Sequence, residues 1–216
     1  MKLIIGDKNL SSWSMRAWLV AKISELPFEE ILVQLNQPKT KLNLEKYSSS
    51  AKVPCLIYED ICIWDSLAIC EFLADSTDLN LWPKDKKLKA IARSYVSEMH
   101  SGFFSMREQL SMDLRLKIEL RHLTEQTIKD IDRVLQLWTD ALIRSKGPFL
   151  FGEFGIVDAF FAPVVFRFLS YGIHIKSEII LNYMKEIQNF EHVQKWVNAG
   201  VSEIYKPHLF NCKSDI

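Results

Sequence analysis

Short apolar runs alternate with stretches of helical periodicity over the first 77 residues. The apolar runs predict strands at residues 2–6, 28–35, 53–58 and 61–64. Helical spacing predicts helices at residues 14–26 and 65–76, and the polar residues 36–48 are weakly helical. The first two strands are joined by a helix and should be parallel, whereas Glu59 and Asp60 make a tight hairpin between the last two. We therefore predict a β-α-β-α-β-β-α order, with a mixed sheet covered by helices.

Helical periods dominate from residue 86 onward, after turn residues and Pro83 end the strand pattern. The predicted helices cover residues 88–110, 117–145 and 155–172, with two shorter ones near 178–188 and 190–199. Residues 155–172 are apolar on all sides, which is typical of a central buried helix. The predicted fold class is therefore α/β followed by all-α. We predict an N-terminal domain over residues 1–78, a linker over 79–86 and an all-helical domain over 87–216.

Charge and cysteine content narrow the class of protein. The 27 basic and 27 acidic residues balance, so no net field favours nucleic acid or an anionic membrane as a partner. The most apolar stretch, residues 156–169, is shorter than the ~20 residues that span a bilayer. The histidines show no metal-ligand spacing, and no C-x-x-C pair occurs among Cys55, Cys62, Cys70 and Cys212. We expect a soluble, metal-free, cytoplasmic protein in which Cys55, Cys62 and Cys70 are buried thiols.

Val53 and Pro54 stand at the start of a predicted strand. Proline cannot donate a ladder hydrogen bond, so it belongs at a strand start or a bend. With a cis bond, the N–H and C=O groups of Val53 would point away from the sheet and could pair with a peptide-like ligand as an added strand. With a trans bond, Pro54 would simply begin the strand.

Asp65 and Ser66 end one predicted strand and open a helix. A helix start offers free N–H groups and a partial positive charge, so a ligand carboxylate could bind there with the Ser66 hydroxyl also donating. Asp65 could hold an ammonium group beside it, and the two residues would then suit an α-amino acid group. The alternative is an ordinary helix N-cap.

The stretch NLSSWSMRAW, residues 9–18, places Ser11 and Ser12 at or just before the start of the first helix. A hydroxyl there can donate to a bound thiolate, and the helix dipole favours the negative charge. Together they lower the pKa of a thiol from ~8.5 toward neutrality. Neither serine fits a nucleophile, because no histidine lies nearby in the sequence and no G-x-S-x-G motif occurs. Helix capping is the alternative for this run as well.

All three features lie where loops leave strand ends and helices begin, so we expect them at one edge of the same sheet. A ligand that carries a thiol, a peptide backbone and an α-amino acid end would use all of them. Glutathione carries these three groups, and the pattern therefore indicates a glutathione site.

The chain resembles the cytosolic glutathione transferases over nearly its whole length. The resemblance rests on VP before a strand, the Asp-Ser pair twelve residues later, the linker LNLWPKD and the helical second half. SSWSMR resembles the S-S-x-S-x-R signature of the zeta class, the maleylacetoacetate isomerase group. The chain is more similar still to a bacterial group with N-x-S-S-W-S-x-R-x-W and E-M-H-S-G-F. The resemblance implies a thioredoxin-like N-terminal domain and a homodimer.

The resemblance also implies residue roles for glutathione binding. Ser11 matches the serine that stabilises the thiolate in zeta-like enzymes, and Ser12 and Trp13 continue that loop. Val53 would bind the cysteinyl backbone, and Asp65 and Ser66 would hold the γ-glutamyl end. Lys39 would lie near the position that contacts the glycine end of glutathione. The remaining implied binding positions are Lys52 and Pro54.

A pocket for the electrophile would face the thiol from the first long helix of the second domain. The resemblance implies that its lining residues are Met99, His100, Phe103 and Met112. Arg107 and Arg115 either attract an anionic co-substrate or belong to a solvated helix face.

The chain departs from the family pattern at several positions. Asp65 replaces the more common glutamate or glutamine, and because its side chain is shorter, a bridging water could connect it to the ligand. Trp13 stands where the zeta signature has cysteine, and GIVD replaces the S-x-x-D cap of the buried helix. The first tyrosine is Tyr47 and the first cysteine is Cys55, which excludes the tyrosine- and cysteine-type relatives.

The resemblance implies a transferase that adds the glutathione thiolate to a small electrophile. Two alternatives remain open. The first is glutathione-dependent cis-trans isomerisation of a maleylacetoacetate-type diacid, with glutathione as cofactor. The second is a transferase-like binding protein without turnover.

Overall fold

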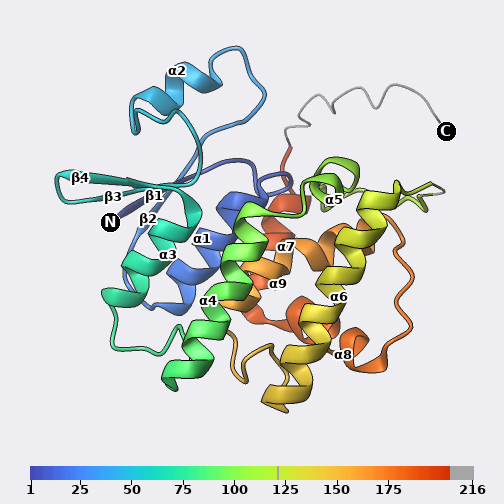
Figure 1. The fold of residues 1–216 in the computed structure, drawn as a ribbon. Helices are drawn as coiled ribbons and strands as arrows, with labels where there is room; N and C mark the ends of the chain where they lie inside the picture. Colours follow the sequence, from blue (N-terminus) through green and yellow to red (C-terminus); the bar gives the residue numbers. More distant parts are fainter. Residues whose placement is uncertain (121, 205–216) are drawn as a thin grey trace.

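The computed structural model describes residues 1–120 and 122–204 (Figure 1). Its sheet contains β1 (Lys2–Ile5), β2 (Glu29–Leu32), β3 (Cys55–Tyr58) and β4 (Ile61–Trp64), in the order β2-β1-β3-β4. β1 pairs with β2 in parallel and with β3 antiparallel, and β3 pairs antiparallel with β4. The predicted mixed sheet with an antiparallel hairpin is confirmed.

Helices cover both faces of this sheet. α1 (Ser12–Ile23) and α3 (Ser66–Asp75) pack against each other on one face, and the short α2 (Thr40–Glu45) lies on the other (Figure 1). A separate small cluster of Ile4, Val33, Leu44 and Cys55 is buried on the α2 side. The thioredoxin-like N-terminal half is therefore present as predicted.

The second half of the described chain is all helical. It contains α4 (Lys86–Ser101), α5 (Phe104–Gln109), α6 (Glu125–Ser145), α7 (Ile156–Ser170), α8 (Glu178–Asn189) and α9 (Glu191–Val201). α7 is buried along almost its whole length and packs against α1, α4 and α8. It is the predicted central helix, and it joins the helical half to the sheet half through α1 (Figure 1).

Two predicted helices are shorter than the periodicity indicated. The helix predicted over residues 88–110 breaks between α4 and α5, where Phe103 adopts a left-handed φ of 60°. A Cβ atom on Gly102 would lie 2.8 Å from the carbonyl oxygen of Glu98, so only glycine allows this close approach. Met112 therefore lies beyond α5 rather than on a long helix. The helix predicted from residue 117 begins only at Glu125, because the Thr124 side chain caps it there.

Cys55 and Cys70 are buried free thiols as expected, while Cys62 is half-buried and Cys212 lies outside the described residues. Within residues 1–120 and 122–204, no helix combines the length and hydropathy needed to cross a membrane.

Candidate functional site

Strand register brings the three sequence features to one edge of the sheet. Ile4 of β1 lies opposite Cys55 of β3, and continuing this register places Gly6 opposite Val53. Cys55 in turn lies opposite Trp64 of β4, so Asp65 follows beside Pro54. The serine loop leaves this same edge directly after β1. The predicted convergence of the three features thus follows from the pairing of the strands.

The serine run caps α1. Ser11 is the N-cap residue, and its Oγ accepts a hydrogen bond from the N–H of Ser14 at 3.3 Å. The Ser11 hydroxyl also donates to Oγ of Ser14 at 2.8 Å, and that oxygen accepts from the N–H of Gly6 at 3.0 Å. The hydroxyl proton of Ser11 is therefore already used in the hydrogen bond to Ser14. The backbone N–H of Trp13 has no hydrogen-bond partner within the described ranges.

Ser12 is bound differently, although it is equally buried. Its Oγ accepts a hydrogen bond from Nη2 of Arg167 at 3.1 Å. Arg167 comes from the buried helix α7, 155 residues further along the chain. The Ser12 hydroxyl acts only as an acceptor toward Arg167, so its own proton has no acceptor among the residues that the structure describes and can be donated to a ligand.

The peptide bond between Val53 and Pro54 is cis. Neither the N–H nor the C=O of Val53 has a hydrogen-bond partner in the part of the chain that the structure describes. A peptide-like ligand would satisfy both groups.

Asp65 adopts a φ of 77°, a left-handed conformation that is uncommon for a residue with a side chain. Its Oδ1 accepts hydrogen bonds from the N–H groups of Leu67 and Ala68, at 2.8 and 3.4 Å, and so caps α3. Its Oδ2 lies 3.1 Å from Nε2 of His100 on α4. Strain of this kind concentrates at functional sites. Asp65 is thus held from both halves of the protein.

Ser66 begins α3 beside this carboxylate. Its hydroxyl is buried, and it is without a hydrogen-bond partner among residues 1–120 and 122–204. Nδ1 of His100 is unpartnered in the same way. Burial lowers the pKa of His100, helped by the charges of Arg16 and Arg107, while Asp65 acts in the opposite direction. His100 was predicted in the electrophile pocket, and the structure places it between Asp65 and the Trp13 ring.

Trp13 is half-buried and is flanked by cationic and aromatic side chains. The guanidinium carbons of Arg16 and Arg107 lie 4.5 and 4.8 Å from its ring centroid, and His100 meets it edge-on at 5.3 Å. Arg16 is fully buried, and none of its guanidinium nitrogens has a hydrogen-bond partner in the described chain. Burial lowers the pKa of Arg16, and the nearby Arg107 and Arg167 lower it further. The α1 start therefore carries a strongly positive environment.

The other predicted pocket residues are largely enclosed. Met99, Phe103 and Met112 are buried and belong to the main hydrophobic core. Phe103 also lines a groove of about 310 Å³ with Gly102 and residues of α6. Arg107, which the sequence left open, donates to the carbonyl groups of Gly102 and Met99. It therefore belongs to the protein interior rather than to a solvated helix face.

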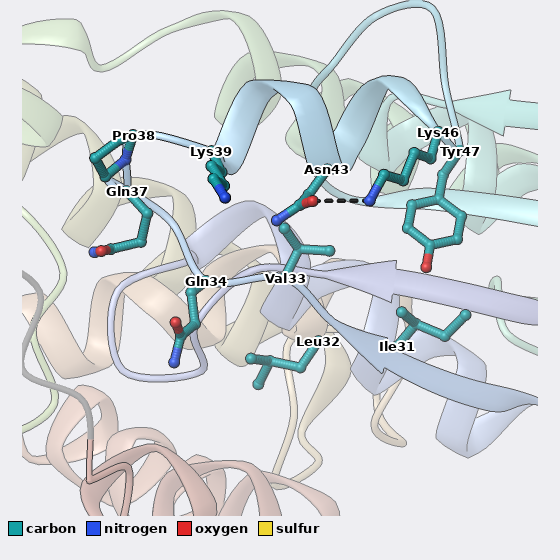
Figure 2. Close-up of a pocket in the computed structure, with 10 residues that line it drawn as sticks. All are labelled: Ile31, Leu32, Val33, Gln34, Gln37, Pro38, Lys39, Asn43, Lys46 and Tyr47. Carbon is teal, nitrogen blue, oxygen red and sulfur yellow. Dashed lines mark hydrogen bonds between the residues drawn. The ribbon is translucent and has the colours of Figure 1, made fainter.

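Lys39 stands at the N-cap of α2 and lines a groove of about 680 Å³ between α2 and the edge strand β2 (Figure 2). Gln34, Gln37 and Asn43 supply further polar atoms to this groove (Figure 2). Among the predicted site residues, only Lys39 lines it, and Lys52 is exposed elsewhere. The described residues contain no cluster of metal-ligating side chains.

The serine loop is anchored by residues that sequence reasoning did not single out. The indole N–H of Trp196 donates to the carbonyl oxygen of Lys8 at 2.9 Å, and Glu203 accepts from the N–H of Lys8 at 2.6 Å. Asn9 donates to Asp113 at 2.9 Å. Because Asn9 lies inside the NLSSWS motif, its place in the motif could have indicated a role in holding this loop. The loop's partners Trp196, Glu203 and Asp113, like Arg167, belong to no recognisable sequence motif, so nothing in the sequence indicated these contacts.

Known proteins resemble this chain in both sequence and fold. The "Probable maleylacetoacetate isomerase" of Caenorhabditis elegans is 32% identical over 93 residues, 43% of this chain and 44% of that protein. The chain thus spans less than half the length of this relative. "Protein IN2-1 homolog A" of Oryza sativa subsp. japonica is 23% identical over 180 residues, 82% of this chain and 70% of that protein.

Solved structures share the whole fold at low sequence identity. A glutathione transferase homolog from Burkholderia GL BGR1 with bound glutathione superposes with a TM-score of 0.69 at 22% identity, covering 94% of this chain and 98% of that one. A bacterial zeta-class maleyl pyruvate isomerase gives a TM-score of 0.73 at 16% identity, covering 93% and 98%.

Family sequence models match both halves of the chain. Residues 10–76 match "Glutathione S-transferase, N-terminal domain", and residues 121–199 match "Glutathione S-transferase, C-terminal domain". Together they cover more than half of the chain and include the serine run, Val53-Pro54, Asp65-Ser66 and α7. The chain therefore belongs to the glutathione S-transferase family.

Proposed function

We propose that the protein binds glutathione at the sheet edge formed by Ser11, Ser12, Val53 and Asp65-Ser66. The thiol would lie at the start of α1, the cysteinyl backbone on Val53 and the γ-glutamyl end at α3. The observation that supports this proposal is a set of polar groups that have no hydrogen-bond partner among residues 1–120 and 122–204 and that could pair with the backbone and the α-amino acid end of glutathione. They are the Val53 backbone groups, the Trp13 N–H and the buried hydroxyl of Ser66.

The proposed reaction is addition of the glutathione thiolate to a small electrophile. Glutathione supplies the nucleophilic sulfur, and the protein supplies positioning and a favourable field for its negative charge. The α1 dipole, the Ser12 hydroxyl and the arginine side chains near Trp13 favour the thiolate over the thiol. Asp65 would hold the α-ammonium of the γ-glutamyl end, and the Ser66 hydroxyl would donate to its carboxylate. Lys39 and Lys52 are proposed to attract the glycine carboxylate.

Isomerisation of a maleylacetoacetate-type diacid is the second candidate. Two similar proteins carry isomerase names, "Probable maleylacetoacetate isomerase" and a zeta-class "Maleyl Pyruvate Isomerase". The two arginine residues beside Trp13, the buried Arg16 and the half-buried Arg107, also suit a doubly anionic substrate. In this reading glutathione adds to the diacid and leaves again, so it acts as a cofactor. A binding protein without turnover is the remaining candidate.

Two further expectations belong to this proposal, a cytoplasmic location and a homodimer. The edge strand β4 supports the homodimer, because Ile61 and Trp64 are 47% and 54% exposed on it. A second copy would cover such apolar side chains at an interface.

Binding and turnover assays separate the candidate functions. Retention on immobilised glutathione, with elution by free glutathione, is expected for both enzymatic functions, and a protein that does not bind would exclude both. Initial rates with aryl halides, epoxides and maleylacetone then distinguish conjugation from isomerisation. Binding without turnover of any of these compounds would favour the non-catalytic candidate.

A further inference from the structure

Arg167 brings a buried positive charge from the helical half to the serine loop. Its guanidinium donates to the carbonyl oxygens of Arg107 and Leu110 and to Oγ of Ser12. The side chain is almost completely buried, at 5% exposure. These contacts fix its orientation, so that one edge of the guanidinium faces the start of α1.

The acceptors around Arg167 are all neutral. Within residues 1–120 and 122–204, no carboxylate forms an ion pair with it. Burial lowers the pKa of Arg167 to about 9, and the like charge of Arg107 acts in the same direction. A buried cation without a counter-charge is costly for a protein to retain. An anion bound close to Ser12 would remove this cost.

Ser12 and Ser11 differ in what they can offer such an anion. The Ser11 hydroxyl donates to Ser14 and caps α1, so it is committed within the helix start. The Ser12 hydroxyl accepts from a cation, which draws electron density from its oxygen and strengthens it as a donor. Hydrogen bonds in such a chain reinforce one another.

We infer that Arg167 is a positioning residue for the glutathione thiolate, and that it acts through the Ser12 hydroxyl, which donates to the sulfur. This inference rests on the proposed function, because it requires glutathione to bind at the sheet edge. When the bound thiol ionises, its proton passes to solvent, and the negative charge on sulfur compensates the charge of Arg167. No other bond forms or breaks in this step.

The coupling between the two charges is reciprocal. A thiolate near Ser12 raises the pKa of Arg167 back toward its ordinary value, and Arg167 lowers the pKa of the thiol by the same free energy. Loss of the arginine charge should therefore appear in the titration of bound glutathione. It should leave the affinity for glutathione itself, measured where the thiol is protonated, largely unchanged.

The test is a pH titration of the ultraviolet thiolate absorbance of glutathione bound to wild-type and variant proteins. Arg167→Gln removes the charge and keeps a hydrogen-bond donor, whereas Arg167→Lys keeps the charge. We expect Arg167→Gln and Ser12→Ala each to raise the thiol pKa by about one unit, a tenfold change in the ionisation constant. The double variant should add little to either change, because both act through one hydrogen bond. Arg167→Lys should stay close to wild type.

Several results would overturn the inference. An unchanged thiol pKa in Ser12→Ala would do so, as would a shift confined to Ser11→Ala. A loss of glutathione affinity in Arg167→Gln without a change in thiol pKa would assign Arg167 to a ligand carboxylate instead. If Arg167→Gln does not fold, as judged by circular dichroism, Ser12→Ala decides the question alone. Wild-type protein that does not bind glutathione would contradict the proposed function itself, which is a separate result.

Discussion

His100 on α4 lies against Asp65 at the start of α3, with 3.1 Å between Nε2 and Oδ2. This contact joins the helical half of the protein to the residue proposed to hold the γ-glutamyl ammonium. The other oxygen of Asp65 caps α3. A single carboxylate therefore links helix capping, the domain interface and the candidate ligand site.

Acid should destabilise the protein through His100. Burial lowers the folded-state pKa of His100, with Arg16 of α1 and Arg107 of α5 acting in the same direction and Asp65 of α3 opposing them. Between that lowered pKa and ~6.5, the unfolded chain binds more protons, so stability rises with pH across this window. His100→Gln should remove this dependence. Unfolding in urea at several pH values between about 5 and 8 measures it.

The quantity to compare is the difference in unfolding free energy between wild type and His100→Gln. The wild type should lose stability relative to the variant as the pH falls below ~6.5. Burial also lowers the pKa of His192, so His192→Gln measures how much pH dependence this second histidine contributes. A constant difference between wild type and His100→Gln across this range would contradict the prediction.

Substitutions at Asp65 should separate capping from ligand binding. Asn caps helices as well as Asp and tolerates a left-handed φ, so Asp65→Asn should change stability by less than about 0.5 kcal/mol. It removes the negative charge, however, and glutathione affinity should fall by at least about tenfold, or 1.4 kcal/mol. Asp65→Ala should additionally lose about 1 kcal/mol of stability with the cap. Calorimetric titration and urea unfolding give the two quantities, and full affinity in Asp65→Asn would rule out the ammonium contact.

Ser66→Ala should have opposite effects on stability and binding. The Ser66 hydroxyl is buried without a partner in the described chain, so its removal should leave stability equal to wild type or up to about 1 kcal/mol higher. The same change removes a donor to the ligand carboxylate and should weaken glutathione binding by about fivefold to tenfold, roughly 1 kcal/mol. Ser76→Ala at the far end of α3 is the control, because it should leave glutathione affinity at the wild-type value. A stability loss without an affinity loss in Ser66→Ala would show that the hydroxyl is structural.

Trp13 should contribute more to stability than to direct ligand contact. Its ring is in contact with Arg16, Arg107 and His100, which come from different helices around the domain interface. Trp13→Ala should cost about 2–4 kcal/mol, because it leaves a cavity and removes both cation–π contacts. Trp13→Phe keeps an aromatic face and should cost only about 1 kcal/mol. Urea unfolding of both variants provides the test, and equal stabilities for Trp13→Ala and Trp13→Phe would exclude the cation–π contribution.

The secondary structure of this protein and the starts of its first helices can be predicted from the sequence. Periodicity predicted the mixed sheet and the buried α7, and the serine run and Asp65 were recognised as helix starts. These features depend on hydrogen bonds and side-chain spacing within a few residues. The break at Gly102 and Phe103 was not predicted, because apolar periodicity continues through it and the close approach to Glu98 appears only in the folded backbone.

The candidate site is held together by contacts between segments that lie far apart in the sequence. The local sequence pattern places Ser11 and Ser12 at the start of α1, and Asp65 and Ser66 at the start of α3. It did not determine that Arg167 donates to Ser12 or that His100 contacts Asp65. Each of these contacts joins a residue of the N-terminal, sheet-containing part to a residue of the helical part. Their partners were fixed only when α4 and α7 packed against α1 and α3, because a lone polar residue within a helical period carries no local signal of what it will meet.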